Sequence, residues 1–345
     1  MINDERLPWH EAHWRQIQQS RATGRLPHAL LLTGPAGLGK GVFARRLAQG
    51  LLCKAPDPEG NACGHCRACH LFQADNHPDY RLIRPEEDHK SAENDSSKKK
   101  SKVIKINQIR DLCVFLDYTS HYSGYKIVLL EPADRLQVNA ANSLLKTLEE
   151  PPGNSLLLLV TAQAARLPVT VRSRCQVLSF NTPSREVSGP WLASQLSGSL
   201  EPIALLDAAN GAPLAALAYA DGERWRRRQS LMKDYEQVIT GQLDPIQAAE
   251  NWMQGNLTEN LRWLINWHTD LVRLKMSPDT PQFRNPDARS VLQNWVIRQS
   301  SHRLFARLDA AIRLHTLCAT TQVNTQLLLE VFFSSVSGNE KSNTF

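Results

Sequence analysis

The sequence lacks an uninterrupted apolar run long enough to span a bilayer, and its first residues carry charges where a secretory signal would be apolar. It also lacks a strong charge of either sign, because 40 Lys+Arg and 34 Asp+Glu leave a formal net charge of only +6. That surplus does not by itself identify a nucleic-acid-binding protein. We find no internal repeat. We therefore expect a cytoplasmic protein with no membrane partner.

The composition is that of a globular protein, with 42% hydrophobic, 21% charged and 7% aromatic residues among 345. These values exclude a chain that is disordered throughout, a collagen-like repeat and a coiled-coil rod. At roughly 150 residues per domain, the length indicates two or three domains rather than one.

Short apolar runs alternate with helical patterns in the first half of the chain. The predicted strands are 28–33, 79–83, 125–130, 155–161 and 177–180, and the predicted helices are 40–52, 104–116 and 139–150. The almost wholly apolar run 155–161 is typical of a central strand in a parallel sheet that is covered on both faces.

The composition and the hydrophobic pattern of the sequence change at two places. The polar stretch 86–102 contains a single apolar residue, which predicts a flexible insert. After about residue 181 only helical periodicity remains. The sequence therefore predicts an α/β domain at 1–181, a small helical unit at 182–222 and a longer helical domain at 223–345.

A glycine-rich turn between the first strand and the first helix carries the first chemical motif. The glycines at 34, 37 and 39 and Lys40 fit G-x-x-x-x-G-K, in which backbone N–H groups and a lysine cradle a phosphate. The full motif continues with a Ser or Thr that binds Mg²⁺, and here that residue is Gly41. Phosphate binding and a ligand-free turn both stay open, but metal-assisted hydrolysis is compromised.

The acidic part of a nucleotide site is also altered. An active P-loop ATPase needs an acid at a strand end for Mg²⁺ and, in many families, a following glutamate that orients water. Glu131 stands at the metal-side place as a longer acid, and Pro132 stands where the glutamate should be. Proline cannot accept a proton, so the sequence predicts that turnover is lost.

Four of the seven cysteines are crowded into one segment with the spacing C-x9-C-x2-C-x2-C, namely Cys53, Cys63, Cys66 and Cys69. Four soft thiolates suit tetrahedral Zn²⁺ with a closed shell, so the prediction is a structural zinc. An iron–sulfur cluster and free thiols are the alternatives. The remaining cysteines are expected to be small apolar residues.

A pair of arginines, Arg172 and Arg174, precedes the last predicted strand on a loop at an edge of the α/β domain. An arginine at such a place can reach the γ-phosphate of a neighbouring subunit, which is worth about 10³–10⁵ in rate in other NTPases. The alternative is a pair of solvated loop arginines.

Four segments together resemble the bacterial clamp-loader subunits of the AAA+ class. They are the phosphate loop, the four-cysteine segment, the helix NSLLKTLEEPP (142–152) and the loop RSRC (172–175), in that family's order and at similar spacing. The resemblance is firm over about residues 25–180 and architectural beyond. It implies an α/β plus all-α fold: an AAA+ P-loop domain with a parallel sheet and a zinc module (53–69), a small helical lid and a C-terminal helical collar.

The resemblance also implies a function and partners. The family forms a pentameric machine that opens a ring-shaped sliding clamp and places it on primed DNA, with ATP hydrolysed at subunit interfaces. The partners would be gamma/tau motor subunits, a delta subunit, the clamp and the DNA. Arg174, in the motif Ser173-Arg174-Cys175, would complete the ATP site of an adjacent motor subunit.

Departures from the motor subunits indicate a rigid stator that does not hydrolyse ATP. Besides Gly41 and Pro132, Leu214 stands where motor subunits carry a nucleotide-sensing arginine. The isolated chain is therefore not expected to be a catalyst. An active AAA+ motor subunit, based on the intact Lys40 loop, and a zinc-dependent nucleic-acid-binding module, based on the cysteines and the lysines at 98–102, are the competing hypotheses.

Overall fold

The computed structural model divides the chain into two compact units, Met1–Val187 and Ser188–Phe345. The structure describes residues 6–85, 103–122, 124–196, 201–220, 222–278, 283–297, 299–320 and 323–337. The insert predicted at 86–102 lies outside these residues.

The first unit is built on a five-stranded parallel sheet in the order β2-β3-β4-β1-β5. Its strands are β1 (Ala29–Thr33), β2 (Tyr80–Ile83), β3 (Lys126–Leu130), β4 (Ser155–Val160) and β5 (Gln176–Ser179). All six residues of β4 are buried, and β4 lies in the middle of the sheet. The prediction of a parallel sheet with 155–161 as its central strand is therefore confirmed.

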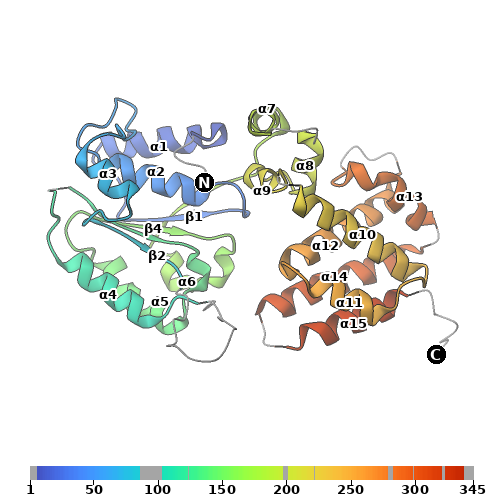
Figure 1. Cartoon of the computed structure of the whole chain (residues 1–345). Coiled ribbons are helices and arrows are strands. Elements are labelled where there is room, and N and C mark those ends of the chain that lie inside the picture. Colours follow the sequence, from blue (N-terminus) through green and yellow to red (C-terminus); the bar gives the residue numbers. More distant parts are fainter. Residues whose placement is uncertain are drawn as a thin grey trace, which may run out of the picture. The chain divides into compact units, whose positions relative to one another are not determined.

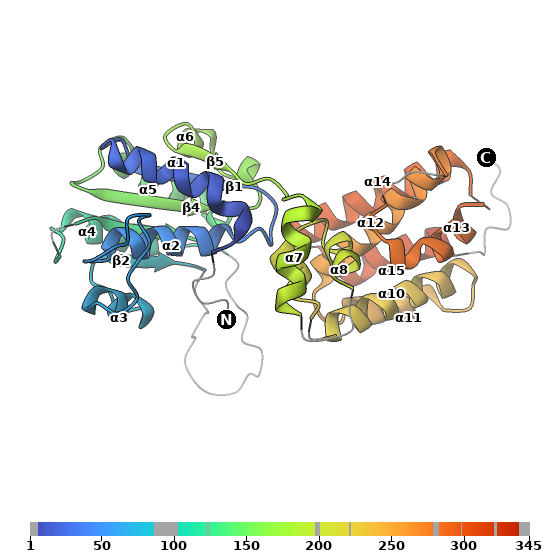
Figure 2. The ribbon, with the colours of Figure 1, turned by 90° about the horizontal axis from the view of Figure 1, so that it is seen from above.

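Helices cover both faces of this sheet, and the alternation of side chains along each strand explains how (Figure 1). Leu31, Val128 and Leu157 share one buried cluster with α4 (Ile106–Asp117) and α5 (Val138–Glu149). Residues of opposite parity, such as Leu30 and Leu158, are equally buried and face the side of α1 (Glu11–Ala22) and α2 (Lys40–Leu52). Figure 2, seen from above, shows α1 and α2 lying over the sheet.

The remaining elements of the first unit are short and lie in its connections. They are η1 (Pro8–His10), α3 (Arg67–Gln73), η2 (Ala133–Arg135), η3 (Ala164–Arg166) and α6 (Val169–Arg172). The sequence predicted α2, α4 and α5 but neither α1 nor α3. The helix α5 ends directly before Glu150 and the two prolines that follow it, as the conformational restriction before proline requires.

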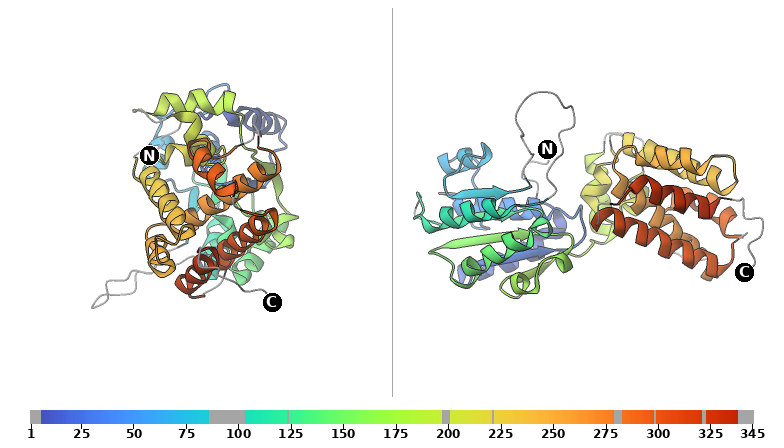
Figure 3. Two further views of the ribbon diagram at one scale, coloured as in Figure 1. Left: turned by 90° about the vertical axis from the view of Figure 1, so that its right-hand side faces the viewer. Right: turned by 90° about the horizontal axis from the view of Figure 1, so that it is seen from below.

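The second unit is entirely helical in its described residues (Figure 3). Its elements are α7 (Arg185–Gln195), α8 (Pro202–Ala208), α9 (Pro213–Leu217), α10 (Glu223–Ile239), α11 (Pro245–Met253), α12 (Leu257–Met276), η4 (Pro286–Ala288), α13 (Arg289–Ile297), α14 (Ser301–Thr320) and α15 (Thr325–Val336). One hydrophobic cluster runs from Leu192 through Trp252 to Phe333. The division into a lid and a collar stays a prediction.

The core of the helical unit also contains a buried polar network. Arg228 on α10 is 1% exposed, and its guanidinium pairs with Asp287 and donates to Asn285 Oδ1 at 2.6 Å. Asp270 on α12 in turn accepts from the Asn285 backbone N–H at 2.9 Å. These contacts fasten the segment around η4 to α10 and α12.

Among the described helices, none is both long and apolar enough to cross a membrane.

Candidate functional site

The four clustered cysteines converge where α2 ends and α3 begins. Cys53 follows the last residue of α2, Cys66 precedes α3 and Cys69 lies in the first turn of α3. Their four sulfur atoms all lie within 4.8 Å of one another. The Sγ of Cys53 is 3.5 Å from that of Cys63 and 3.9 Å from that of Cys66. The structure thus brings together the four residues that the sequence singled out.

These distances between sulfur atoms fit tetrahedral coordination of one metal ion. A Zn–S bond of about 2.3 Å places the sulfur atoms of a tetrahedral site about 3.8 Å apart. Burial opposes ionisation of Cys66, but hydrogen bonds from the Lys54 and Cys69 backbone and from the Cys69 and Cys63 thiols together outweigh it and bring the pKa of this thiol down to about 6. A thiolate is the form that binds a metal. The four cysteines can therefore hold a metal ion.

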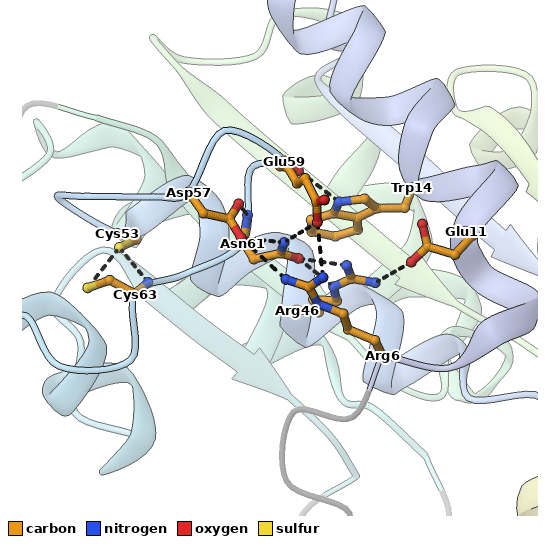
Figure 4. Close-up of polar contacts among 9 residues, drawn as sticks. All are labelled: Arg6, Glu11, Trp14, Arg46, Cys53, Asp57, Glu59, Asn61 and Cys63. Carbon is orange, nitrogen blue, oxygen red and sulfur yellow. Dashed lines mark hydrogen bonds and ion pairs between the residues drawn. The ribbon is translucent and has the colours of Figure 1, made fainter. Parts of the chain in front are cut away.

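A buried arginine supports the loop between Cys53 and Cys63 (Figure 4). Arg46 on α2 is 7% exposed, donates through Nε and Nη2 to Asn61 Oδ1 at 3.0 and 2.6 Å, and lies 3.8 Å above the centre of the Trp14 ring. Asn61 in turn donates to the carboxylate of Asp57 at 2.7 and 2.8 Å. Trp14 Nε1 donates to the Glu59 carbonyl at 2.9 Å. The loop is thereby fixed to both α1 and α2.

Glycine permits this close packing. A Cβ at Gly50 on α2 would lie 2.3 Å from the carbonyl oxygen of Gly60, which is closer than real contacts allow. Gly60 itself has a φ of 84°, a conformation that other residues rarely adopt. The loop before Cys63 therefore rests directly on the α2 backbone.

The phosphate loop lies at the opposite end of α2. Its three glycines, Gly34, Gly37 and Gly39, have φ values of 133°, 82° and 80°, and a Cβ at Gly34 would lie 2.1 Å from the Phe180 carbonyl oxygen. The Nζ of Lys40 donates to the carbonyl oxygens of Gly34 and Pro35, at 2.7 and 2.6 Å. Lys40 is therefore folded back onto the loop that it follows.

The metal side of this loop is filled by protein. A Cβ at Gly41 would lie 2.0 Å from Glu131 Oε1, so the Glu131 carboxylate occupies the space of a longer residue at 41. Glu131 Oε2 accepts from Arg84 Nη2 at 2.8 Å. Burial lowers the pKa of Lys40 to about 8, against the opposing effect of the Glu131 and Asp134 carboxylates. Arg84 thus pairs with the acid that the sequence placed on the metal side.

Residues that the sequence did not single out complete this surrounding. The Asp134 carboxylate accepts from Thr161 Oγ1, at the end of β4, at 2.6 Å. Trp9 Nε1 donates to the carbonyl oxygen of Leu38 at 2.9 Å, and His10 Nε2 lies 2.8 Å from the same oxygen. The segment before α1 therefore packs against the phosphate loop. No sequence signal indicated this contact, because Trp9 and His10 are distant in sequence from Leu38.

Arg174 lies between α6 and the edge strand β5, as the sequence suggested. Its Nη2 is 2.5 Å from Glu149 Oε1, and its Nη1 donates to the Thr170 carbonyl oxygen at 2.9 Å. Leu214, the third predicted departure, lies in α9 of the helical unit.

The matched families define the class. Residues 9–184 match the family described as "DNA polymerase III, delta subunit", and residues 222–335 match "DNA polymerase III, delta subunit, C terminal". The α/β domain with a parallel sheet, followed by helical structure, is the fold that the sequence predicted. The chain is thus related to DNA polymerase III delta subunits over both of its units.

Individual relatives narrow the class further. The DNA polymerase III subunit delta' of Pseudomonas aeruginosa is 35% identical over 329 residues, 94% of each chain. That of Escherichia coli K12 is 31% identical over 325 residues, 93% of this chain and 92% of the relative. A DNA polymerase III gamma subunit-related protein of Thermotoga maritima aligns over 94% of this chain and 97% of its own, with a TM-score of 0.45 and 18% identity. The chain belongs to the family of DNA polymerase III delta' subunits.

Proposed function

We propose that this chain is the stator of a clamp loader: it helps to place a ring-shaped sliding clamp on primed DNA and does not itself hydrolyse ATP. The observation that carries the stator role is the position of Glu131. Its carboxylate lies beside Gly41 and is already paired with Arg84. A Mg²⁺ ion at this place would have to displace the guanidinium, and it would find no hydroxyl ligand at position 41.

Two further positions support the loss of turnover. Pro132 follows Glu131 and offers no side chain that could orient an attacking water. Leu214 stands where the family resemblance implies a nucleotide-sensing arginine in motor subunits. The loop glycines and Lys40 keep backbone geometry that suits a phosphate. A nucleotide held there would be bound without metal-assisted turnover.

The same proposal gives Arg174 a role in trans. Its side chain is one third exposed, at 34%, and it lies just before the start of the edge strand β5 rather than in the core. From there it would reach the ATP of an adjacent gamma/tau subunit and stabilise charge that develops on the γ-phosphate. A delta subunit, the clamp and primed DNA would complete the assembly, in the cytoplasm.

We assign the four-cysteine site to structural Zn²⁺. Four thiolates leave no coordination position for water, and Zn²⁺ prefers this closed tetrahedral set. An iron–sulfur cluster would use the same ligands, so metal analysis of protein purified without added metal separates the two. Zinc near one ion per chain supports the assignment, and iron with acid-labile sulfide contradicts it.

The test of the stator role is reconstitution with motor subunits, delta, clamp and primed DNA. We expect no ATP turnover by the isolated chain, and we expect Lys40→Ala to leave the ATPase of the complex unchanged. Arg174→Ala should lower DNA-stimulated ATPase and clamp loading, whereas the matched control Arg166→Ala should not. Turnover by the isolated chain that Lys40→Ala abolishes would instead establish an active motor subunit.

A further inference from the structure

A carboxylate from a separate element holds Arg174. The Glu149 carboxylate at the end of α5 meets Nη2 at 2.5 Å, and the Thr170 carbonyl meets Nη1 at 2.9 Å. Thr170 is one turn away in the same short segment, so Glu149 is the contact that ties the guanidinium to another helix. Because two different nitrogens are engaged, both the position and the plane of the planar guanidinium are restrained.

Glu149 is an unfavourable residue for the helix that carries it. It is the last residue of α5, where the negative end of the helix dipole disfavours an acid. The acid is 50% exposed and its partner 34% exposed, and ion pairs at such sites contribute little to folding stability. Neither helix stability nor fold stability therefore explains a glutamate at this position.

The backbones that carry the two charges are held rigidly. Leu144 and Leu148 on α5 share one buried cluster with Val171 and Cys175, which flank Arg174. The Cys175 thiol also donates to the Val171 carbonyl oxygen at 3.3 Å. The packing of α5 against the segment 171–175 thus sets the distance between the backbones of Glu149 and Arg174, and the ion pair forms between side chains that are already close.

We propose that Glu149 is a positioning residue for Arg174, and this inference rests on the proposed role of Arg174 in trans. A free arginine side chain loses rotamer freedom when it is ordered at a phosphate. By restraining the guanidinium before subunits meet, Glu149 reduces that loss and directs the remaining N–H groups away from α5, where an adjacent subunit would present its nucleotide.

The test compares Glu149→Ala and Glu149→Gln in the reconstituted complex, with Glu150→Gln as the matched control at the next position. We expect Glu149→Ala to lower kcat of the DNA-stimulated ATPase about ten-fold, less than the roughly 10²-fold cost of a full 1 Å misplacement. The KM for ATP and the thermal midpoint of the isolated chain should not change. Glu149→Gln should lose less, because its amide oxygen still accepts a hydrogen bond.

A double substitution separates positioning from other roles. In the Arg174→Ala background, Glu149→Ala should cause no further loss, since the group that it positions is gone. An additive loss would overturn the inference, and so would wild-type kcat in Glu149→Ala. If Arg174→Ala itself leaves the ATPase unchanged, the role in trans fails first, and that outcome is distinct from a failure of Glu149 alone.

Discussion

The two ends of α2 differ in how their polar groups are satisfied. At its first residue, Lys40 donates to carbonyl oxygens of its own loop, and Glu131 is paired with Arg84. About 20 Å away, at 1.5 Å per residue for the 13 residues of the helix, four sulfur atoms converge beyond its last residue. At the first end the charged groups pair within the protein. At the second end four cysteines form a ligand set that could hold a metal ion.

The contrast teaches how differently the two places depend on a cation. Near the phosphate loop no cation is needed to balance Glu131, because Arg84 pairs with it. Removing a structural cation would leave four thiols packed within 4.8 Å of one another, with repulsion between any that ionise. A metal ion at the four cysteines would therefore matter to local structure, whereas the acid near the phosphate loop is already paired within the protein.

The largest effect is expected from breaking the cysteine site. Cys66→Ser should abolish metal binding and open the segment 53–69, because apparent binding energies of structural zinc sites are about 10–16 kcal/mol. Metal content and limited proteolysis of this segment measure the result. Cys318→Ser, in the helical unit, is the matched control and should retain both the metal and protease resistance.

The next effect concerns the support beneath that site. Arg46→Ala should destabilise the first unit by about 3 kcal/mol, because it removes a buried cation and leaves the Asn61 side-chain oxygen without its donor. Denaturant unfolding measures this. Arg45→Ala is a close control, since its pair with Asp75 is exposed and should contribute at most about 1 kcal/mol. Equal losses at both positions would contradict the account.

Acid should weaken the packing at the phosphate-loop end. Burial lowers the pKa of His10 to about 4 from 6.5. Between these values the unfolded chain binds a proton that the folded chain does not, so stability falls as the pH is lowered, by about 2 kcal/mol from pH 7.5 to pH 5. Urea unfolding of His10→Gln at both pH values should show a smaller fall than the parent. An unchanged slope would refute this.

The smallest effect is expected from restoring the missing hydroxyl. Gly41→Ser would push the Glu131 carboxylate out of its place and weaken its pair with Arg84, at a cost of about 1 kcal/mol. Because Asp is shorter than Glu, Gly41→Ser with Glu131→Asp should relieve the clash and recover part of this stability, while the pair with Arg84 is still lost. Thermal midpoints compare the two variants. A single variant as stable as the parent would show that the space is already free.

Local sequence patterns predicted the elements but not their long-range partners. The apolar run 155–161 and the prolines after Glu150 fix a strand and a helix end through short-range physics. The cysteine spacing likewise predicted a cluster that the fold closes. Arg84, in contrast, reaches Glu131 only because β2 pairs with β3, with Ile83 opposite Leu130. Neither strand segment alone predicts which strand it pairs with.

The same limit applies to the residues that fasten the site. Arg46 lies in a predicted helix, but no motif marked it. Its burial depends on α1, which the sequence did not predict. Glu149 belonged to a recognised motif, yet its contact with Arg174 depends on the packing of α5 against α6. An acid at a helix end where the dipole disfavours it was the one local signal available.

The contact between Gly41, Glu131 and Arg84 also couples three positions. A serine at position 41 would meet the Glu131 carboxylate, and a shorter acid at position 131 would withdraw from Arg84. A change at any one of the three residues therefore alters the contacts of the other two, and the effects of such changes on stability should not be additive.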